Sequence, residues 1–135
     1  MDLFSAYFVC VYYRLQANWM RWKKNLERSR RINRSKFIQG LNSNIELSDK
    51  ERRRAIRNSI NKRPWKLNCT IAMEEFAELT QQVSKQIRGY GDRIGLIEEM
   101  ADAYICLKLL ESIFNISPED MQKAIDVKMD RERKR

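Results

Sequence analysis

The stretches MEEFAEL (residues 73–79) and EEMADAYICLKLL (residues 98–110) decide the fold of this chain. Apolar residues recur at helical spacing around both, which predicts one helix over about residues 68–88 and another from residues 94–96 to about residue 114. Gly89-Tyr-Gly91-Asp92 lies between them and predicts a turn, so the two helices should pack antiparallel. The expected apolar positions are Ala72, Phe76, Leu79 and Val83 in the first helix, and Leu96, Met100, Ala103, Leu107, Leu110 and Phe114 in the second.

Each of these helices carries two carboxylates three residues apart, Glu75 with Glu78 and Glu99 with Asp102. At that spacing two side chains share a helix face. At about 100° per residue, all four fall on or beside the apolar faces. None of them has Lys or Arg four residues further along, which is the usual position of a local partner.

An unpaired carboxylate on an apolar face must shift its pKa or find a countercharge. Antiparallel packing would bring the two acidic pairs face to face, and a hard divalent cation would relieve their repulsion. All-oxygen ligation suits Mg²⁺, with Mn²⁺ as the alternative. Either pair taken alone would favour a solvated acidic surface, whereas both together in adjacent helices favour a metal site.

The composition favours an all-α domain and excludes several kinds of chemistry. The 135 residues include only 4 Gly and 2 Pro, too few for a fold built on many tight turns. The chain has no His, which excludes Ser-His and Cys-His nucleophile pairs and His-ligated zinc. The three cysteines, Cys10, Cys69 and Cys106, are far apart, which is typical of core residues in a reducing compartment. We therefore expect a cytoplasmic protein.

Charge is unevenly distributed along the chain, whose formal net charge is +9. The first 66 residues carry 17 Lys and Arg against 5 Asp and Glu, whereas residues 67–127 carry 5 against 11. Residues 16–40 predict a basic helix, and residues 42–44 a polar turn. Ser48-Asp-Lys-Glu51 is a capping-box pattern that predicts a second basic helix, ending near Asn61 before the break at residues 62–64.

The two ends of the chain carry further signals. Leu3–Tyr13 is apolar but shorter than the ~20 residues that a membrane-spanning helix needs, and it lacks the basic start of a signal peptide. Near the other end, Ser117-Pro118 predicts the start of a third helix of the acidic region. On that helix Lys128 shares the face of Met121 and Ala124, so we expect it to point inward.

These acidic motifs resemble the MazG-like, all-α nucleotide pyrophosphohydrolase superfamily, whose hallmark is E-x-x-E followed by E-x-x-D on consecutive helices. The superfamily includes dimeric dUTPases, dCTP pyrophosphatases and phosphoribosyl-ATP pyrophosphohydrolase. The resemblance covers about residues 66–135. It implies a helical bundle completed by forming a homodimer or homotetramer, here preceded by a basic helical extension. The domains expected are an extension over residues 1–47 and a MazG-like domain over residues 48–135.

The resemblance also implies an activity and a set of site residues. The activity is Mg²⁺-dependent hydrolysis of a nucleoside triphosphate, usually a deoxynucleotide, to the monophosphate and pyrophosphate, which makes the chain a hydrolase acting on acid anhydrides. Relatives carry basic residues on the last helix that contact phosphates, and a polar residue six positions before the acidic pair that lies near the base. The implied residues are the metal ligands Glu75, Glu78, Glu99 and Asp102, the catalytic candidates Glu74, Glu75 and Glu78, and the substrate contacts Lys128, Arg131 and Asn68.

Two alternatives stay open at this point. Asn68 fits the N-cap of its helix as well as it fits a contact with a base. The chain as a whole can also be a non-catalytic helical protein that holds nucleic acid through its basic half. The residues that support this second interpretation are Arg28–Arg34, Arg52–Arg54, Arg57, Lys62 and Arg63, interleaved with Trp19, Trp22 and Trp65.

Overall fold

The computed structural model describes residues 20–21, 24–25 and 27–135. The apolar stretch Leu3–Tyr13, the residues Trp19 and Trp22, and the expected start of the first basic helix lie outside the described residues. The chain divides into two compact units, with the boundary between Ile45 and Glu46. The sequence predicts its domain boundary two residues further on, between residues 47 and 48.

The first unit contains one helical segment that the structure describes without a gap over residues 27–41. A turn over residues 42–44 follows it, as the sequence predicts. Most side chains of this segment are exposed, and Phe37 and Ile38 are half-buried.

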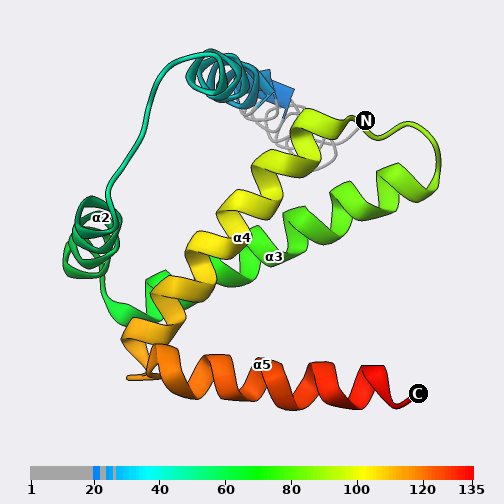
Figure 1. Cartoon of the computed structure of the whole chain (residues 1–135). Coiled ribbons are helices and arrows are strands. Elements are labelled where there is room, and N and C mark those ends of the chain that lie inside the picture. The colour runs from blue at the N-terminus through cyan, green and yellow to red at the C-terminus, as the bar shows by residue number, and fades with distance from the viewer. Residues whose placement is uncertain (1–19, 22–23, 26) are drawn as a thin grey trace, which may run out of the picture. The chain divides into compact units, whose positions relative to one another are not determined.

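The second unit contains four helices: α2 (Asp49–Lys62), α3 (Trp65–Ile87), α4 (Arg93–Ile113) and α5 (Pro118–Arg133). Helices α3 and α4 form an antiparallel hairpin (Figure 1). Helix α2 packs against α4. The described residues contain helices, turns and extended connections but no strand, so the all-α prediction is confirmed for them. No helix in the described part of the chain is both long enough and apolar enough to cross a membrane.

Two of the helices begin at the caps that the sequence predicts. The side chain of Ser48 accepts a hydrogen bond from the backbone N–H of Glu51, and the carboxylate of Glu51 accepts one from the backbone N–H of Ser48. Two of the unpaired N–H groups at the start of α2 are thereby satisfied. At α5 the side chain of Ser117 accepts from the N–H of Asp120, and Pro118 occupies the first turn.

The turn between α3 and α4 depends on two glycines. Gly89 adopts a φ of 77°, which closes α3 with bonds from Gly89 N–H to Gln86 and from Tyr90 N–H to Lys85. A Cβ atom on Gly91 would lie 2.7 Å from the backbone nitrogen of Gln86, so only glycine fits there. Asp92 then caps α4 by accepting from the N–H of Gly95 at 2.9 Å. The turn thus fixes the antiparallel course of the hairpin.

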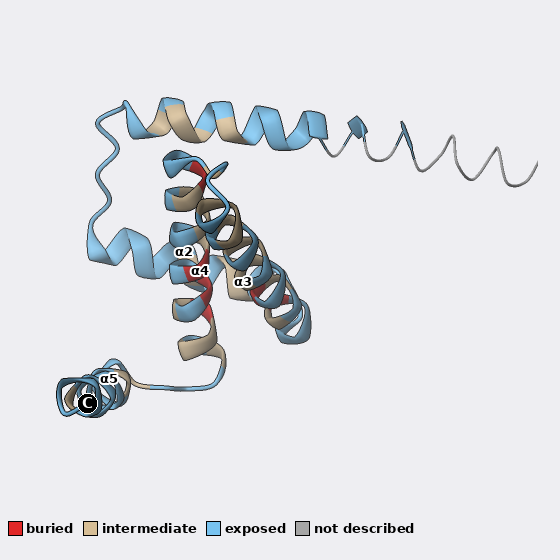
Figure 2. Ribbon diagram, turned by 90° about the vertical axis from the view of Figure 1, so that its right-hand side faces the viewer, coloured by how far each residue is buried: buried red, intermediate tan, exposed pale blue. Residues whose placement is uncertain are grey.

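The core of the described chain lies between α3 and α4. Ala72 of α3 packs with Cys106 and Leu109 of α4. Figure 2 shows buried parts on both of these helices. Four half-buried residues pack against this cluster: Ile56 and Ile60 of α2, Phe76 of α3 and Leu110 of α4. The cluster has only three buried members, and one of them, Ala72, has a short side chain.

The apolar face predicted for α4 is wrong in part. Ala103 is buried and Leu110 is half-buried, but Met100 and Phe114 are each 55% exposed. Cys106 and Leu109 are buried in their place. Apolar residues occur almost all round α4, so their periodicity does not identify the side that packs on α3.

The start of α3 and the face of α5 also differ from the predictions. Helix α3 begins at Trp65, three residues before the expected start, with Pro64 at its N-cap. Helix α5 has no buried residue, and Lys128 is exposed on it. The prediction that Lys128 points inward is therefore wrong for the described chain, because no other described segment covers that face of α5.

Candidate metal centre

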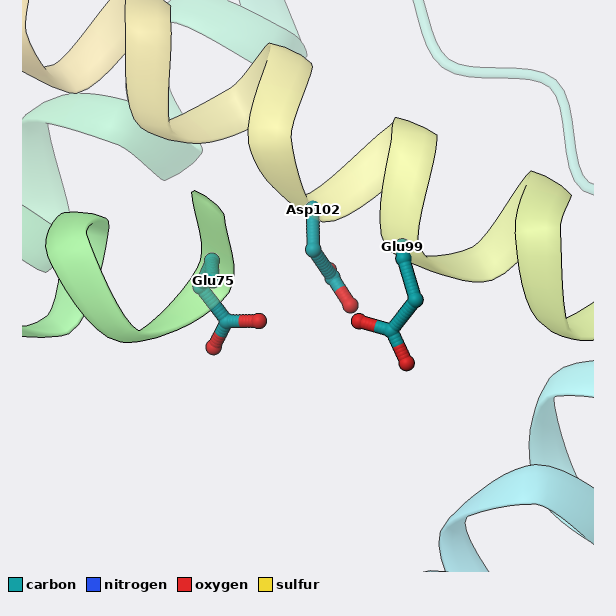
Figure 3. Close-up of side chains that lie close together, drawn as sticks. All are labelled: Glu75, Glu99 and Asp102. Carbon is teal, nitrogen blue, oxygen red and sulfur yellow. The ribbon is translucent and has the colours of Figure 1, made fainter. Parts of the chain in front are cut away.

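Three carboxylates meet at the middle of the α3–α4 hairpin. Glu75 comes from α3, and Glu99 and Asp102 come from successive turns of α4. Each offers one carboxylate oxygen, and the three oxygens all lie within 4.8 Å of one another. Figure 3 shows the three side chains converging on the space between the helices. We call Glu75, Glu99 and Asp102 the acidic triad.

The helices place the triad next to the core rather than on the open surface. Glu75 lies one turn after the buried Ala72, and Asp102 lies between the half-buried Glu99 and the buried Cys106. All three triad residues are half-buried. The sequence prediction that these acids lie on the packed side of each helix is confirmed. The hairpin therefore holds three like charges together in a site only partly open to water.

The carboxylates of the triad repel one another, and burial and neighbouring acids raise their pKa values. Burial raises the pKa of Glu99 to about 7, and the neighbouring charges of Glu78, Asp102, Glu75 and Glu98 add to this rise. Burial also raises the pKa of Glu75, with Asp102 as the largest of the charges that contribute. The pKa of Asp102 rises for the same reasons, burial first and the charge of Glu78 second.

No cation within the described part of the chain offsets this repulsion. The ion pairs of Lys108 with Glu111, and of Arg133 and Lys134 with Asp130, all lie outside the triad. Nothing lowers the pKa of Glu75, Glu99 or Asp102. Such a cluster persists at neutral pH only if it takes up protons or binds a cation.

Glu78, the fourth expected ligand, lies beside the triad but outside the group of converging oxygens. It is half-buried, and its charge raises the pKa of every triad member. Glu74 is exposed, and its charge raises the pKa of Glu75. The structure thus brings three of the four expected ligands within reach of one ion, with Glu78 and Glu74 next to them.

Asn68 has a different place from the one predicted for an N-cap. It lies inside α3, is 2% exposed, and its side-chain amide donates long hydrogen bonds to the carbonyls of Ile60 and Arg63, at 3.5 and 3.4 Å. These carbonyls belong to the end of α2, which has no intrahelical donors for them. The N-cap interpretation is wrong because α3 begins earlier, and Asn68 instead joins α2 to α3. Its contact with a base stays a prediction.

The remaining predicted residues lie away from the triad in this chain. Lys128 and Arg131 are both exposed on α5. Trp65 is 53% exposed and contacts Phe114 edge-on with ring centres 6.3 Å apart. Cys106 is a neighbour that sequence reasoning did not assign to the site. Burial and the charges of Glu75 and Asp102 raise its pKa, and its position four residues after Asp102 was the available signal.

The donor set fits a hard divalent cation. Bonds of about 2.1 Å place the oxygens around octahedral Mg²⁺ about 3 to 4 Å apart, and the triad's oxygens all lie within 4.8 Å of one another. Carboxylate oxygens are ligands that Mg²⁺ and Mn²⁺ prefer, whereas the chain has no His to bind softer metals. Comparisons with protein-family models, curated proteins and solved structures gave no match.

Proposed function

We propose that the chain is a cytoplasmic, Mg²⁺-dependent nucleoside triphosphate pyrophosphohydrolase. The observation that carries this proposal is the acidic triad of Glu75, Glu99 and Asp102, held across two helices with raised pKa values and no countercharge. The resemblance of E-x-x-E and E-x-x-D to the MazG-like superfamily supplies the reaction class. A triad of this kind matches the substrate class because Mg²⁺ bound by few carboxylates keeps positions for phosphate oxygens.

In the proposed reaction, water attacks the α-phosphorus of a nucleoside triphosphate. The bond between that phosphorus and the oxygen bridging to the β-phosphorus breaks, which gives the nucleoside monophosphate and pyrophosphate. Bound Mg²⁺ supplies charge neutralisation for the phosphates and favours ionisation of water. Glu75, Glu99 and Asp102 are proposed to hold the ion, with Glu78 as a fourth ligand. One of the carboxylates of Glu74, Glu75 and Glu78 orients the water and accepts its proton.

The full site is proposed to form in a homodimer or homotetramer. Many large apolar side chains on α3 and α4 are exposed in the described chain, including Met73, Ile87 and Tyr104. Exposed apolar surface of this extent is typical of protein–protein interfaces. A second copy packed there would cover it. It would also give Lys128 and Arg131 a route to the phosphates that the single chain does not provide.

The test is a panel of canonical and damaged nucleoside triphosphates, incubated with the full-length protein and either Mg²⁺ or EDTA. Pyrophosphate and orthophosphate are assayed separately. We expect pyrophosphate release that requires Mg²⁺ or Mn²⁺, and the ranking of nucleotides identifies the base and sugar. Glu78→Gln should lose this release, whereas Glu119→Gln, an exposed acid at the start of α5, should keep it.

Two outcomes would overturn the proposal. One is the absence of pyrophosphate release from every nucleotide by a folded protein that binds Mg²⁺. The other is release that persists in EDTA or in Glu78→Gln at the wild-type rate. A metal-binding protein without catalysis would then be the better description of the triad.

A further inference from the structure

Helix α2 carries a basic stripe that the proposed hydrolase site does not use. The stripe occupies positions i, i+3, i+4 and i+7 of the helix, which are Lys50, Arg53, Arg54 and Arg57. At about 100° per residue, this spacing places all four on one face of the helix. All four side chains are exposed, and we call them the α2 stripe.

The α2 stripe has no acidic partner among the described residues. The two acids of the helix are engaged elsewhere, because Asp49 pairs with Arg52 at 3.2 Å and Glu51 closes the capping box with Ser48. If these two acids were free, they would offset the positive charge of the α2 stripe. Four positive charges therefore stand within about 11 Å along the helix axis, from a rise of 1.5 Å per residue.

The apolar side of α2, which lies next to the stripe, decides which polyanion fits. Ile56 and Ile60 pack against the core cluster of α3 and α4, and no large apolar side chain lies within the stripe. A helix held firmly on a membrane surface inserts a free apolar face among the lipids, in addition to the attraction between its basic residues and anionic headgroups. The apolar side of α2 is already used inside the protein. A nucleic-acid backbone requires only positive charge and hydrogen-bond donors, both of which the stripe offers.

We infer that the α2 stripe binds the phosphate backbone of nucleic acid. Lys50, Arg53, Arg54 and Arg57 each contact a phosphate, and no base edge is read by them. The interaction is independent of sequence and of the acidic triad. It gives the chain a second activity, attachment to DNA or RNA, which needs no divalent cation.

The test is fluorescence anisotropy of the full-length protein with a labelled 20-nucleotide single strand and a 20-bp duplex, in EDTA, over a range of KCl concentrations. Four phosphate contacts predict a slope of log affinity against log salt of about −2.8 for the single strand and about −3.6 for the duplex. Replacing Arg53, Arg54 and Arg57 with Gln should reduce the slope to about −1 and weaken binding about 100-fold at 0.1 M salt. Replacing the same three with Lys should preserve binding, because the charge is kept.

The control variant carries Gln in place of Lys123, Arg133 and Arg135, three exposed residues of the C-terminal region, and loses the same net charge. It should bind nearly as tightly as the unmodified protein. Circular dichroism checks that each variant keeps its helix content. Equal weakening of both Gln variants, or no binding to either nucleic acid at 50 mM salt, would refute the inference. Binding to phosphatidylserine vesicles that the Gln variant of the α2 stripe loses, without binding to nucleic acid, would refute it as well.

Because the binding assay contains EDTA, its outcome is separate from that of the hydrolase proposal. A protein without pyrophosphohydrolase activity can still bind through the α2 stripe. Conversely, the Gln variant of the stripe should release pyrophosphate at the wild-type rate.

Discussion

Carboxylates have opposite surroundings in two regions of the molecule. On α5, Asp130 accepts hydrogen bonds from Lys134 and Arg133, and both lower the pKa of its carboxyl group. Between α3 and α4, burial and neighbouring acids raise the pKa of Glu99 to about 7. The chain supplies a cation three or four residues away for the first acid and none for the second.

The same contrast holds within α4. Glu111 lies three residues after Lys108, whose ammonium group contacts both of its carboxylate oxygens at 2.9 Å. Glu99 and Asp102, two to three turns earlier on the helix, have only other acids as charged neighbours. The sequence therefore places a cation three or four residues from some of its acids, but not from the acids that lie where α3 and α4 face each other. At neutral pH the repulsion within such a site is relieved by protons or by a bound cation, which is why we propose a metal-binding function for it.

Replacing Glu99 by Gln should have the largest effect, because it should lower activity while it raises the stability of the metal-free protein. Removal of one charge from the proposed metal site is expected to reduce Mg²⁺-dependent pyrophosphate release by about 10²- to 10³-fold, comparable to loss of one key electrostatic group in other enzymes. The same change removes repulsion from the metal-free protein. Discounted for exposure to solvent, the gain in the free energy of unfolding is on the order of 1 kcal/mol, which raises the melting temperature by about 4 to 8 °C.

Glu111→Gln is the matched control on the same helix. It should leave pyrophosphate release unchanged and slightly lower the melting temperature, because Lys108 loses its partner. Steady-state assays and thermal unfolding in EDTA measure both quantities. If Glu99→Gln destabilises the metal-free protein as Glu111→Gln does, Glu99 has a stabilising partner and the contrast between the two acids fails.

Much of this contrast was predictable from the sequence. The i, i+3 spacing of the acids and the absence of Lys or Arg four residues on were enough to place Glu75, Glu99 and Asp102 on facing sides of an antiparallel hairpin. The turn at Gly89 and Gly91 supplied the direction of the chain.

Other features could not be read from the sequence for physical reasons. Helix α4 has apolar residues on nearly every side, so packing against the short side chain of Ala72, rather than periodicity, selects Cys106 and Leu109 for burial. Asn68 is a polar residue whose burial depends on the free carbonyls at the end of α2, which a linear pattern does not show. The inward orientation of Lys128 required a covering surface that the described chain lacks.

The dependence of stability on pH should also differ between the acidic triad and the paired acids. In the unfolded chain Glu99 has the ordinary pKa of 4.5, and in the folded protein its pKa is about 7. Between these values the folded state holds the proton that the unfolded state has lost, so the free energy of unfolding falls as the pH rises. The stabilisation is fully present below pH 4.5 and is lost by about pH 7. The raised pKa values of Glu75 and Asp102 act in the same direction.

We therefore expect the melting temperature in EDTA to fall between pH 5 and pH 8, and Mg²⁺ to reverse this fall. At 100 times its dissociation constant, a bound ion adds about 2.7 kcal/mol to the free energy of unfolding. Differential scanning fluorimetry at constant ionic strength measures both effects. Glu99→Gln should flatten the pH profile and weaken the response to Mg²⁺. A metal-free protein that grows more stable as the pH rises from 5 to 8 would contradict the assignment.

Asp130→Asn should have the smallest effect of these changes. Because the pKa of Asp130 is lowered in the folded protein, its contribution to stability is present above its ordinary pKa of 3.8 and is lost as the pH falls. Ion pairs of this exposed kind contribute little, since water and salt screen them. We expect no measurable change in melting temperature at pH 7, in pyrophosphate release, or in either quantity when salt is raised. A fall of several degrees would show that α5 packs into an interface with a second copy of the chain, where screening by water no longer applies.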